Sequence, residues 1–288
     1  MLVNMKEMLE NAEKEGYAIA CINTPNVDLI RAVVAAAEEL NTAVIIDHAE
    51  VHDALVPLER IAPDMIQYAK AAKVPVCVHL DHGTSYNFLM RAIRAGFTSI
   101  MYDCSALPFE KNVEELKAFT KIAHNLGITV EAELGIMASA EEDSHGGVSL
   151  TNAEIRKYFT DPEEAGRFAE ATGVDALTVC FGSMHGIYAE PPILDIDRVK
   201  AIRRAMPADT KIVMHGASGV AFSEVQKAID AGCCKINYYS YLAKDTTEFV
   251  GQKIAAEGPI AYHELTEAAF EHAKEHAKTV LKQFRNGK

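Results

Sequence analysis

The sequence predicts an α/β protein with a (β/α)8 fold, the TIM barrel, formed as a single domain. Its main support is a repeated unit, in which a helical stretch ends at glycine and a short β-branched run follows, as in RAIRAGFTSIMYD, AEATGVDALTVCFG and KAIDAGCCKIN. The β-branched runs lack polar alternation, which is typical of parallel strands covered on both faces. Eight strand candidates separated by helical patterns in 288 residues favour a closed barrel over an open doubly wound sheet.

Helical patterns flank and separate the predicted strands. One helix precedes the first strand at about Met5–Glu15, and a charged helix closes the chain at about Tyr262–Phe284, within a helical extension from about residue 241 to 288. Gly96 and Gly173 suit the left-handed residue that ends a helix. The eight predicted strands are Ala18–Asn23, Ala43–Asp47, Val76–Leu80, Ser99–Tyr102, Thr129–Glu133, Ala176–Val179, Lys211–Met214 and Lys235–Asn237.

Composition and charge argue against several classes of partner. The chain has 28 Lys and Arg against 41 Asp and Glu, and a formal net charge of −13 disfavours nucleic acid. No apolar run reaches the roughly 18 residues of a membrane helix, and the N-terminus lacks the apolar core of a signal peptide. The six cysteines include no CxxC pair and mostly lie in or beside apolar runs, so we expect buried thiols in a cytoplasmic protein.

Ionisable or amide side chains mark the carboxyl ends of six consecutive predicted strands, where barrel enzymes place their chemistry. Three histidines from adjacent strands suit a catalytic zinc ion, because neutral imidazoles leave a coordination position open. Spacing alone leaves open which histidines converge, and it leaves His48 and His52 as substrate contacts or solvated loop residues. The polar residues at these strand ends are His79, Asp81, His82, Asp103, Glu131, Glu133, His185, His215 and Asn237.

The motifs HLDHG, VEAELG, GSMHG, MHGASGV and KIN resemble those of the class II ketose-bisphosphate aldolases, the fructose- and tagatose-bisphosphate aldolase family. The resemblance covers nearly the whole chain. It implies a zinc-dependent lyase of carbohydrate metabolism, which reversibly cleaves a ketose 1-phosphate or bisphosphate to dihydroxyacetone phosphate and an aldehyde. His82, His185 and His215 look like the catalytic zinc ligands. Asp81 looks like the acid/base that acts at the cleaved bond.

The resemblance implies further roles. Glu141, in the long loop after the fifth strand, matches the glutamate that moves the proton on the nucleophilic carbon. Asp103 and Glu133 look like a second position, for a divalent or monovalent cation, or like the acids that orient the zinc ligands. The partner is a small-molecule sugar phosphate, and the chain is expected to be a homo-oligomer, a dimer or a tetramer. The implied substrate-binding residues are Asn23, Gly186, Gly216, Ala217, Ser218, Asn237, Tyr239, Ser240 and Lys244.

Departures from the family pattern cluster at substrate-contact positions. Ala189 stands where the family often has a phosphate-facing lysine, and Tyr239 replaces an acid that contacts substrate hydroxyls. The arginine expected at the distal phosphate is absent, and Lys244 lies one place further on. Losing arginine at a bidentate phosphate site is not a conservative change. We therefore hypothesise that the aldehyde is not ordinary glyceraldehyde 3-phosphate, and is instead unphosphorylated, deoxygenated or differently charged.

Two other functions stay open. A zinc-dependent barrel hydrolase usually has an HxH pattern on its first strand, whereas this strand ends in Cys-Ile-Asn. A non-catalytic family member, acting as an assembly or regulatory subunit, should have lost ligands, yet the three histidines and Asp81 are present. A lysine Schiff base needs a desolvated lysine at a strand end, and Lys235 opens its strand instead.

Overall fold

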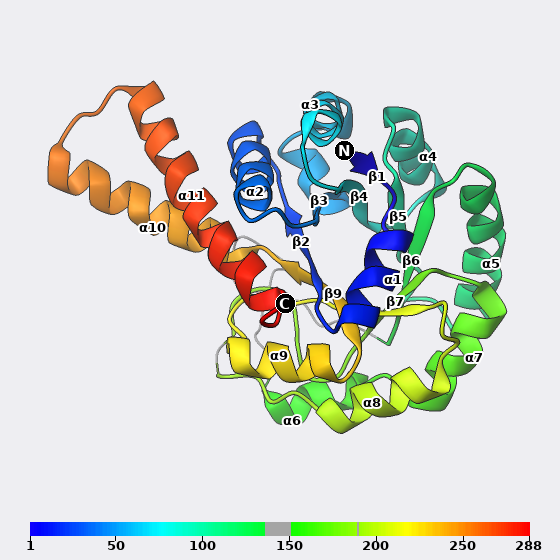
Figure 1. Cartoon of the computed structure of the whole chain (residues 1–288). Coiled ribbons are helices and arrows are strands. Elements are labelled where there is room, and N and C mark those ends of the chain that lie inside the picture. Colours follow the sequence, from blue (N-terminus) through cyan, green and yellow to red (C-terminus); the bar gives the residue numbers. More distant parts are fainter. Residues whose placement is uncertain (136–150, 189) are drawn as a thin grey trace.

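A computed structural model describes residues 1–135, 151–188 and 190–288, and it contains a closed parallel barrel surrounded by helices (Figure 1). The barrel strands are β2 (Ile19–Asn23), β3 (Val44–Ala49), β4 (Val76–Gly83), β5 (Ser99–Tyr102), β6 (Thr129–Leu134), β7 (Ala176–Val179), β8 (Lys211–Met214) and β9 (Cys233–Tyr238). Their hydrogen-bonded order is β4-β3-β2-β9-β8-β7-β6-β5, and a pairing of β4 with β5 closes the ring. The predicted TIM-barrel fold is confirmed.

Four barrel strands extend beyond their predicted carboxyl ends. β4 continues furthest, past Leu80 to Gly83, whereas β3 ends at Ala49, β6 at Leu134 and β9 at Tyr238. The polar residues at these ends have the composition of a loop, but burial inside the barrel keeps them in the sheet. Consequently Asp81 and His82 belong to a strand rather than to a turn.

A short strand, β1 (Leu2–Val3), lies outside the predicted set. It pairs in parallel with the start of β4, where Leu2 lies opposite Val76. The amino group of Met1 donates a hydrogen bond to the Val74 carbonyl at 2.7 Å, which anchors this end of the chain. Two residues are too few to show a hydrophobic period, so the sequence pattern could not reveal this strand.

Helices cover the outside of the barrel. Gly96 and Gly173 follow α4 and α7 in the left-handed conformation, with φ of 93° and 69°, as the pattern predicted. The helices are α1 (Lys6–Glu15), α2 (Val27–Glu39), α3 (Leu58–Ala71), α4 (Tyr86–Ala95), α5 (Phe109–Asn125), α6 (Asn152–Ile155), α7 (Pro162–Thr172), α8 (Ile196–Ala205), α9 (Phe222–Asp230), α10 (Ser240–Glu257) and α11 (Tyr262–Phe284), with the 3-10 turns η1 (Glu50–Ala54) and η2 (Arg156–Tyr158).

The barrel interior is apolar at one end and polar at the other. At the amino-terminal end, Leu9 of α1 and Met5, which directly precedes this helix, close the barrel and pack with Ile19 and Val213. Toward the carboxyl ends of the strands, charged and polar side chains are buried instead. All six cysteines are buried, unpaired thiols, as expected from the sequence. The polar interior includes Asp47, His79, Asp81, Glu131, Thr178, His215, Lys235 and Asn237.

The C-terminal region forms a helical hairpin. In Figure 1, α10 runs outward from the barrel and α11 returns to it. The returning half of α11 packs on α2 and α9. It buries Ala273, Ala277 and Val280 in the core, whereas α10 buries Leu242 near its start. The helical extension expected from about residue 241 corresponds to these two helices.

Candidate active site

A pocket of about 470 Å³ opens at the carboxyl ends of the barrel strands. Most of the predicted site residues line it, and Val51 and His52 from the turn after β3 join them. Among the described residues that line the pocket, none is lysine or arginine. The lining residues are Asn23, Ala49, Val51, His52, Asp81, His82, Asp103, Ser105, Glu133, His185, Gly186, Gly216, Ser218, Asn237, Tyr238, Tyr239 and Ser240.

Three histidines converge at the floor of this pocket. His82 is the last residue but one of β4, His185 lies in the loop after β7, and His215 directly follows β8. His215 Nδ1 lies 3.1 Å from His82 Nε2 and 3.3 Å from His185 Nε2. The ligand atoms of all three lie within 4.8 Å of one another, close enough to share one metal ion. The sequence motifs therefore selected three histidines that the fold brings together.

The backbone at His82 explains how two neighbouring side chains reach the same pocket. In a regular strand, Asp81 and His82 would point to opposite faces. His82 instead has a φ of 46°, in the left-handed region that non-glycine residues seldom adopt. Such a conformation costs on the order of 1–3 kcal/mol and persists at sites where the surroundings enforce it.

Carboxylates orient two of the three imidazole rings. Asp103 Oδ2 lies 2.7 Å from His82 Nδ1, and Glu131 Oε1 lies 2.9 Å from His215 Nε2. Each carboxylate accepts a hydrogen bond from the ring N–H group that it faces, so the opposite nitrogen is left to act as a metal ligand. Glu133 lies within 4.8 Å of the ligand atoms of His82 and Asp103 as well.

The electrostatics of the floor favour a cation. Burial opposes a charge on His82, yet the carboxylates of Asp81 and Asp103 raise its pKa to about 10. Burial and the neighbouring histidines hold the pKa of His185 well below its usual value. Burial also lowers the pKa of His215. The carboxylates thus stabilise a positive charge at this position, while the rings of His185 and His215 stay neutral. Neutral imidazoles beside carboxylates are the donors of a divalent metal site.

Asp81 is held as an ionised carboxylate beside the histidines. Its Oδ1 accepts a hydrogen bond from Asn237 Nδ2 at 3.2 Å, and its Oδ2 accepts one from Asn23 Nδ2 at 3.5 Å. Burial opposes its charge, but electrostatic interactions with His82, His215 and Lys235 lower its pKa below the usual range. The side chain therefore has the protonation state of a general base.

Asp47, one strand away, is in the opposite state. Burial and the charge on Asp81 raise its pKa well above the usual value. It accepts hydrogen bonds from Asn23 Nδ2 and, at 3.2 Å, from Cys21 Sγ. The pair resembles other sites in which two carboxyl groups are driven to different protonation states. Asp47 was not among the predicted site residues, because a single acid at a strand end carries no specific signal.

The side of the pocket formed by the loops after β7, β8 and β9 is rich in backbone donors. Gly186, Gly216 and Ser218 lie there, and Ser240 begins α10. Ser218 Oγ accepts a hydrogen bond from the Tyr239 amide at 3.0 Å. A helix N-terminus with nearby glycines binds anions, because several N–H groups point outward.

Tyr188 holds two of these loops together, and sequence reasoning did not identify it. Its hydroxyl donates to the Gly216 carbonyl at 2.7 Å and accepts from the Met184 amide at 2.8 Å. The motif around His185 contains this tyrosine, so position within the motif was the available signal.

Four predicted residues are not among the described residues that line the pocket. His215 meets the other two histidines but is itself fully buried, and Ala217 is buried with its amide donating to the Asn237 carbonyl at 3.3 Å. Lys244 does not line the pocket, since its ammonium group lies 3.9 Å from Glu248 and over the ring of Tyr241. Glu141 falls outside the described residues, as does Ala189.

The turn after β3 supplies a further wall of the pocket. Val51 and His52 of η1 line the pocket, and the His52 ring meets the Tyr239 ring edge-on with centroids 5.4 Å apart. Glu50 fixes this turn, because its carboxylate accepts the Thr84 amide at 2.6 Å. The wall is therefore aromatic and aliphatic. Of its members, the sequence had suggested Tyr239 and, as an open alternative, His52.

Comparison with known proteins agrees with this geometry. The family model for class II fructose-bisphosphate aldolase matches residues 3–288. The YdjI aldolase from Escherichia coli K12 is 32% identical and superimposes with a TM-score of 0.86, covering 99% of this chain and 97% of that one. A candidate fructose-1,6-bisphosphate aldolase from Coccidioides immitis is 25% identical, with a TM-score of 0.85 and coverage of 97% and 95%. Fructose-bisphosphate aldolase from Campylobacter jejuni shares the fold, with a TM-score of 0.78. It is 21% identical, and the match covers 98% of this chain and 95% of that one.

The fold and the histidine-lined pocket are those of a barrel enzyme with a candidate metal centre. By the family match over nearly its full length, the chain belongs to the class II fructose-bisphosphate aldolase family. Family and structural neighbours together support aldolase activity, a lyase reaction. No described helix is long and apolar enough to cross a membrane.

Proposed function

We propose that the protein is a zinc-dependent aldolase that cleaves a ketose 1-phosphate or bisphosphate to dihydroxyacetone phosphate and an aldehyde. The main observation that supports this proposal is that the ring nitrogens of His82, His185 and His215 converge beside the ionised carboxylate of Asp81. When bound by these imidazoles, zinc supplies Lewis-acid stabilisation of the negative charge that retro-aldol cleavage leaves on the donor half. Asp103 and Glu133 either orient these ligands or hold a second cation.

The remaining catalytic and binding roles belong to residues of the chain. Asp81 takes the proton from the hydroxyl group at the cleaved bond, and Glu141, in the long loop after β6, exchanges the proton on the nucleophilic carbon. Gly186, Gly216, Ser218 and Ser240 bind the donor phosphate through backbone and hydroxyl donors. Asn23 and Asn237 keep Asp81 oriented.

The lining of the pocket supports an aldehyde half without a phosphate. Gly186, Gly216, Ser218 and Ser240 are assigned to the donor phosphate, and no described lining residue offers an arginine or a lysine to a second phosphate on the aldehyde half. Residues 136–150 contain neither residue type in the sequence. The wall formed by Val51, His52 and Tyr239 suits an uncharged aldehyde instead. A cytoplasmic location and assembly as a dimer or tetramer stay predictions.

The decisive experiment is a screen of aldehydes with dihydroxyacetone phosphate, with and without added zinc. We expect carbon–carbon bond formation that EDTA abolishes and zinc restores, with uncharged aldehydes preferred over glyceraldehyde 3-phosphate. The Asp81→Asn variant should bind zinc normally yet turn over slowly. High efficiency on fructose or tagatose bisphosphate would refute the acceptor assignment. Zinc binding without turnover on any acceptor would favour a non-catalytic subunit, and zinc-dependent hydrolysis would favour a barrel hydrolase.

A further inference from the structure

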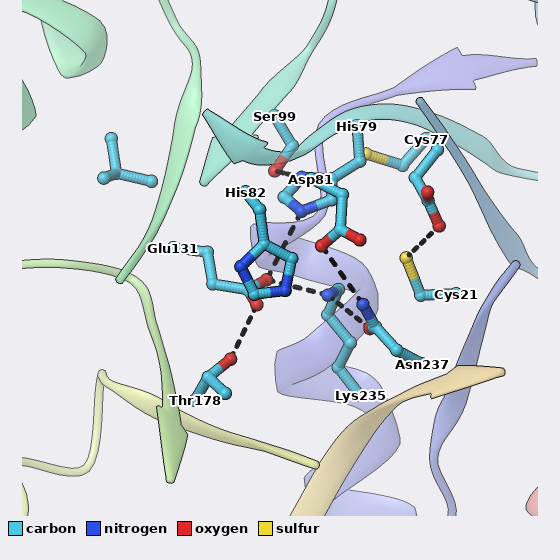
Figure 2. Close-up of polar contacts among 12 residues, drawn as sticks. Cys21, Cys77, His79, Asp81, His82, Ser99, Glu131, Thr178, Lys235 and Asn237 are labelled. Carbon is cyan, nitrogen blue, oxygen red and sulfur yellow. Dashed lines mark hydrogen bonds and ion pairs between the residues drawn. The ribbon is translucent and has the colours of Figure 1, made fainter. Parts of the chain in front are cut away.

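β9 places the ammonium group of Lys235 inside the barrel with no exposed surface, beside Glu131 and Asn237 (Figure 2). Its Nζ lies 2.7 Å from Asn237 Oδ1 and 2.8 Å from Glu131 Oε2. Lys235 does not line the pocket, so it acts on the reaction only through other residues. We propose that Lys235 is a positioning residue, which turns the amide of Asn237 toward Asp81 and holds Glu131 behind His215.

The first part of this role concerns the amide of Asn237. An asparagine side chain can present either its oxygen or its NH₂ group to a neighbour, and the hydrogen-bond network decides which. An ammonium group only donates, so the Asn237 oxygen must face Lys235. The NH₂ group then faces Asp81 Oδ1 at 3.2 Å, as Figure 2 shows. Without the ammonium group, the Asn237 oxygen loses its donor, and the amide is held from one side alone, by its hydrogen bond to Asp81.

The second part concerns Glu131. Its Oε1 accepts from Thr178 Oγ1 at 2.8 Å and lies 2.9 Å from His215 Nε2, while Oε2 lies against Lys235. The carboxylate is thus held from two sides in the orientation that fixes the ring of His215. One lysine therefore connects the two halves of the site, the metal-ligand half and the half that holds Asp81.

A purely structural role explains this arrangement poorly. Barrel interiors are usually filled by layers of apolar side chains, and burying an ion costs several kcal/mol even when it is paired. The chain also offers a matched comparison at the other end of the barrel. Lys211 is 7% exposed, and its Nζ lies 2.6 Å from Glu13 Oε2 and 2.7 Å from the Ala208 carbonyl. It is a buried, ion-paired lysine that is remote from the pocket.

The test compares Lys235→Met with Lys211→Met, and it rests on the proposed function for its kinetic arm. At saturating zinc, Lys235→Met should lower kcat by roughly 10²-fold, the loss expected from misplacing a reacting group by about 1 Å, with KM changed far less. Its zinc affinity, measured by chelator competition, should fall by about 10–100-fold, as for other residues that orient metal ligands. Lys211→Met should lose thermal stability but keep both values.

A second comparison separates the positioning role of Lys235 from its role in balancing the charge of Glu131. This comparison also tests the proposal if Lys235→Met does not fold. Glu131→Gln is compared with the double variant Glu131→Gln/Lys235→Met, in which the buried pair is neutral. Positioning predicts that the double variant loses a further tenfold or more in kcat, because Asn237 is no longer oriented. Equal kcat values in these two proteins would overturn the proposal. It would also be overturned if Lys235→Met matched Lys211→Met in both kcat and zinc affinity. Should the wild-type protein show no aldolase turnover, the proposed function fails separately, and the zinc affinities still test the role of Lys235.

Discussion

Replacing Gly216 with alanine would press a methyl group into the backbone of the neighbouring loop. Gly216 directly follows His215, and the added Cβ would lie 2.2 Å from the carbonyl oxygen of Met184, which directly precedes His185. The substitution therefore acts on the two loops that bring His185 and His215 together. Tyr188, whose hydroxyl bonds to both loops, resists their separation.

The size of the effect follows from this contact. Real Cβ atoms essentially never approach other atoms within 3.0 Å, so the contact of 2.2 Å requires the loops to separate by about 0.8 Å. Displacements near 1 Å at reacting groups cost about 10²-fold in rate. In addition, the left-handed φ of 67° at Gly216 costs roughly 1–2 kcal/mol for a residue with a Cβ. We expect Gly216→Ala to lose about 10²-fold in kcat and to bind zinc more weakly.

Gly173→Ala is the matched control. Gly173 has a φ of 69°, and no atom lies within 4 Å of its added Cβ, so the variant bears the backbone strain without the collision. Both variants should lose a similar amount of stability from the strained left-handed backbone, and Gly216→Ala alone should lose activity. The assays are zinc affinity by chelator competition and retro-aldol turnover at saturating zinc. If both variants match in kcat and in zinc affinity, the argument from loop separation is wrong.

Three further predictions concern the metal, the pH and the substrate. Zinc at about 1,000 times its Kd should raise the unfolding free energy by about 4 kcal/mol over the chelated protein, measured by denaturant titration; no shift would contradict a folded-state zinc site. Burial lowers the pKa of His48 from 6.5 to about 4. The unfolded chain is therefore protonated first, and up to about 3 kcal/mol of stability should disappear as the pH falls from 6.5 to 4. The His48→Leu variant should not show this loss of stability. If its unfolding free energy depends on pH as in the wild-type protein, the prediction for His48 is wrong. Val51→Arg should raise kcat/KM for glyceraldehyde 3-phosphate relative to glyceraldehyde, whereas an unaltered ratio would place the aldehyde elsewhere.

The sequence by itself was sufficient for the barrel. Helix-to-strand units repeat along the chain, and glycines such as Gly96 and Gly173 end helices where their left-handed conformation is favoured. These are local signals, set by periodicity and backbone sterics, so they can be recognised without knowing the fold. The two-residue strand β1 left no such signal, because it is too short to show a period and pairs with β4, more than seventy residues away.

Much of the candidate site could also be predicted, through motifs rather than through periodicity. HLDHG, GSMHG and MHGASGV contain the three histidines that the barrel brings together. The convergence itself depends on the left-handed backbone at His82, which no local pattern requires. Lys235 was interpreted from its place at the start of a strand, as a poor Schiff-base candidate. Its contacts with Glu131 and Asn237 became visible only in the closed barrel.

Only the tertiary structure decided which side chains share the pocket and in which state of charge. The wall of Val51 and His52, the exclusion of Lys244, and the opposite protonation of Asp47 and Asp81 all depend on residues that are distant in sequence. Burial and the electrostatic field act through space, whereas helix and strand preferences act along the chain. The sequence therefore determined the architecture and the family, and the closure of the barrel determined the chemistry available at its floor.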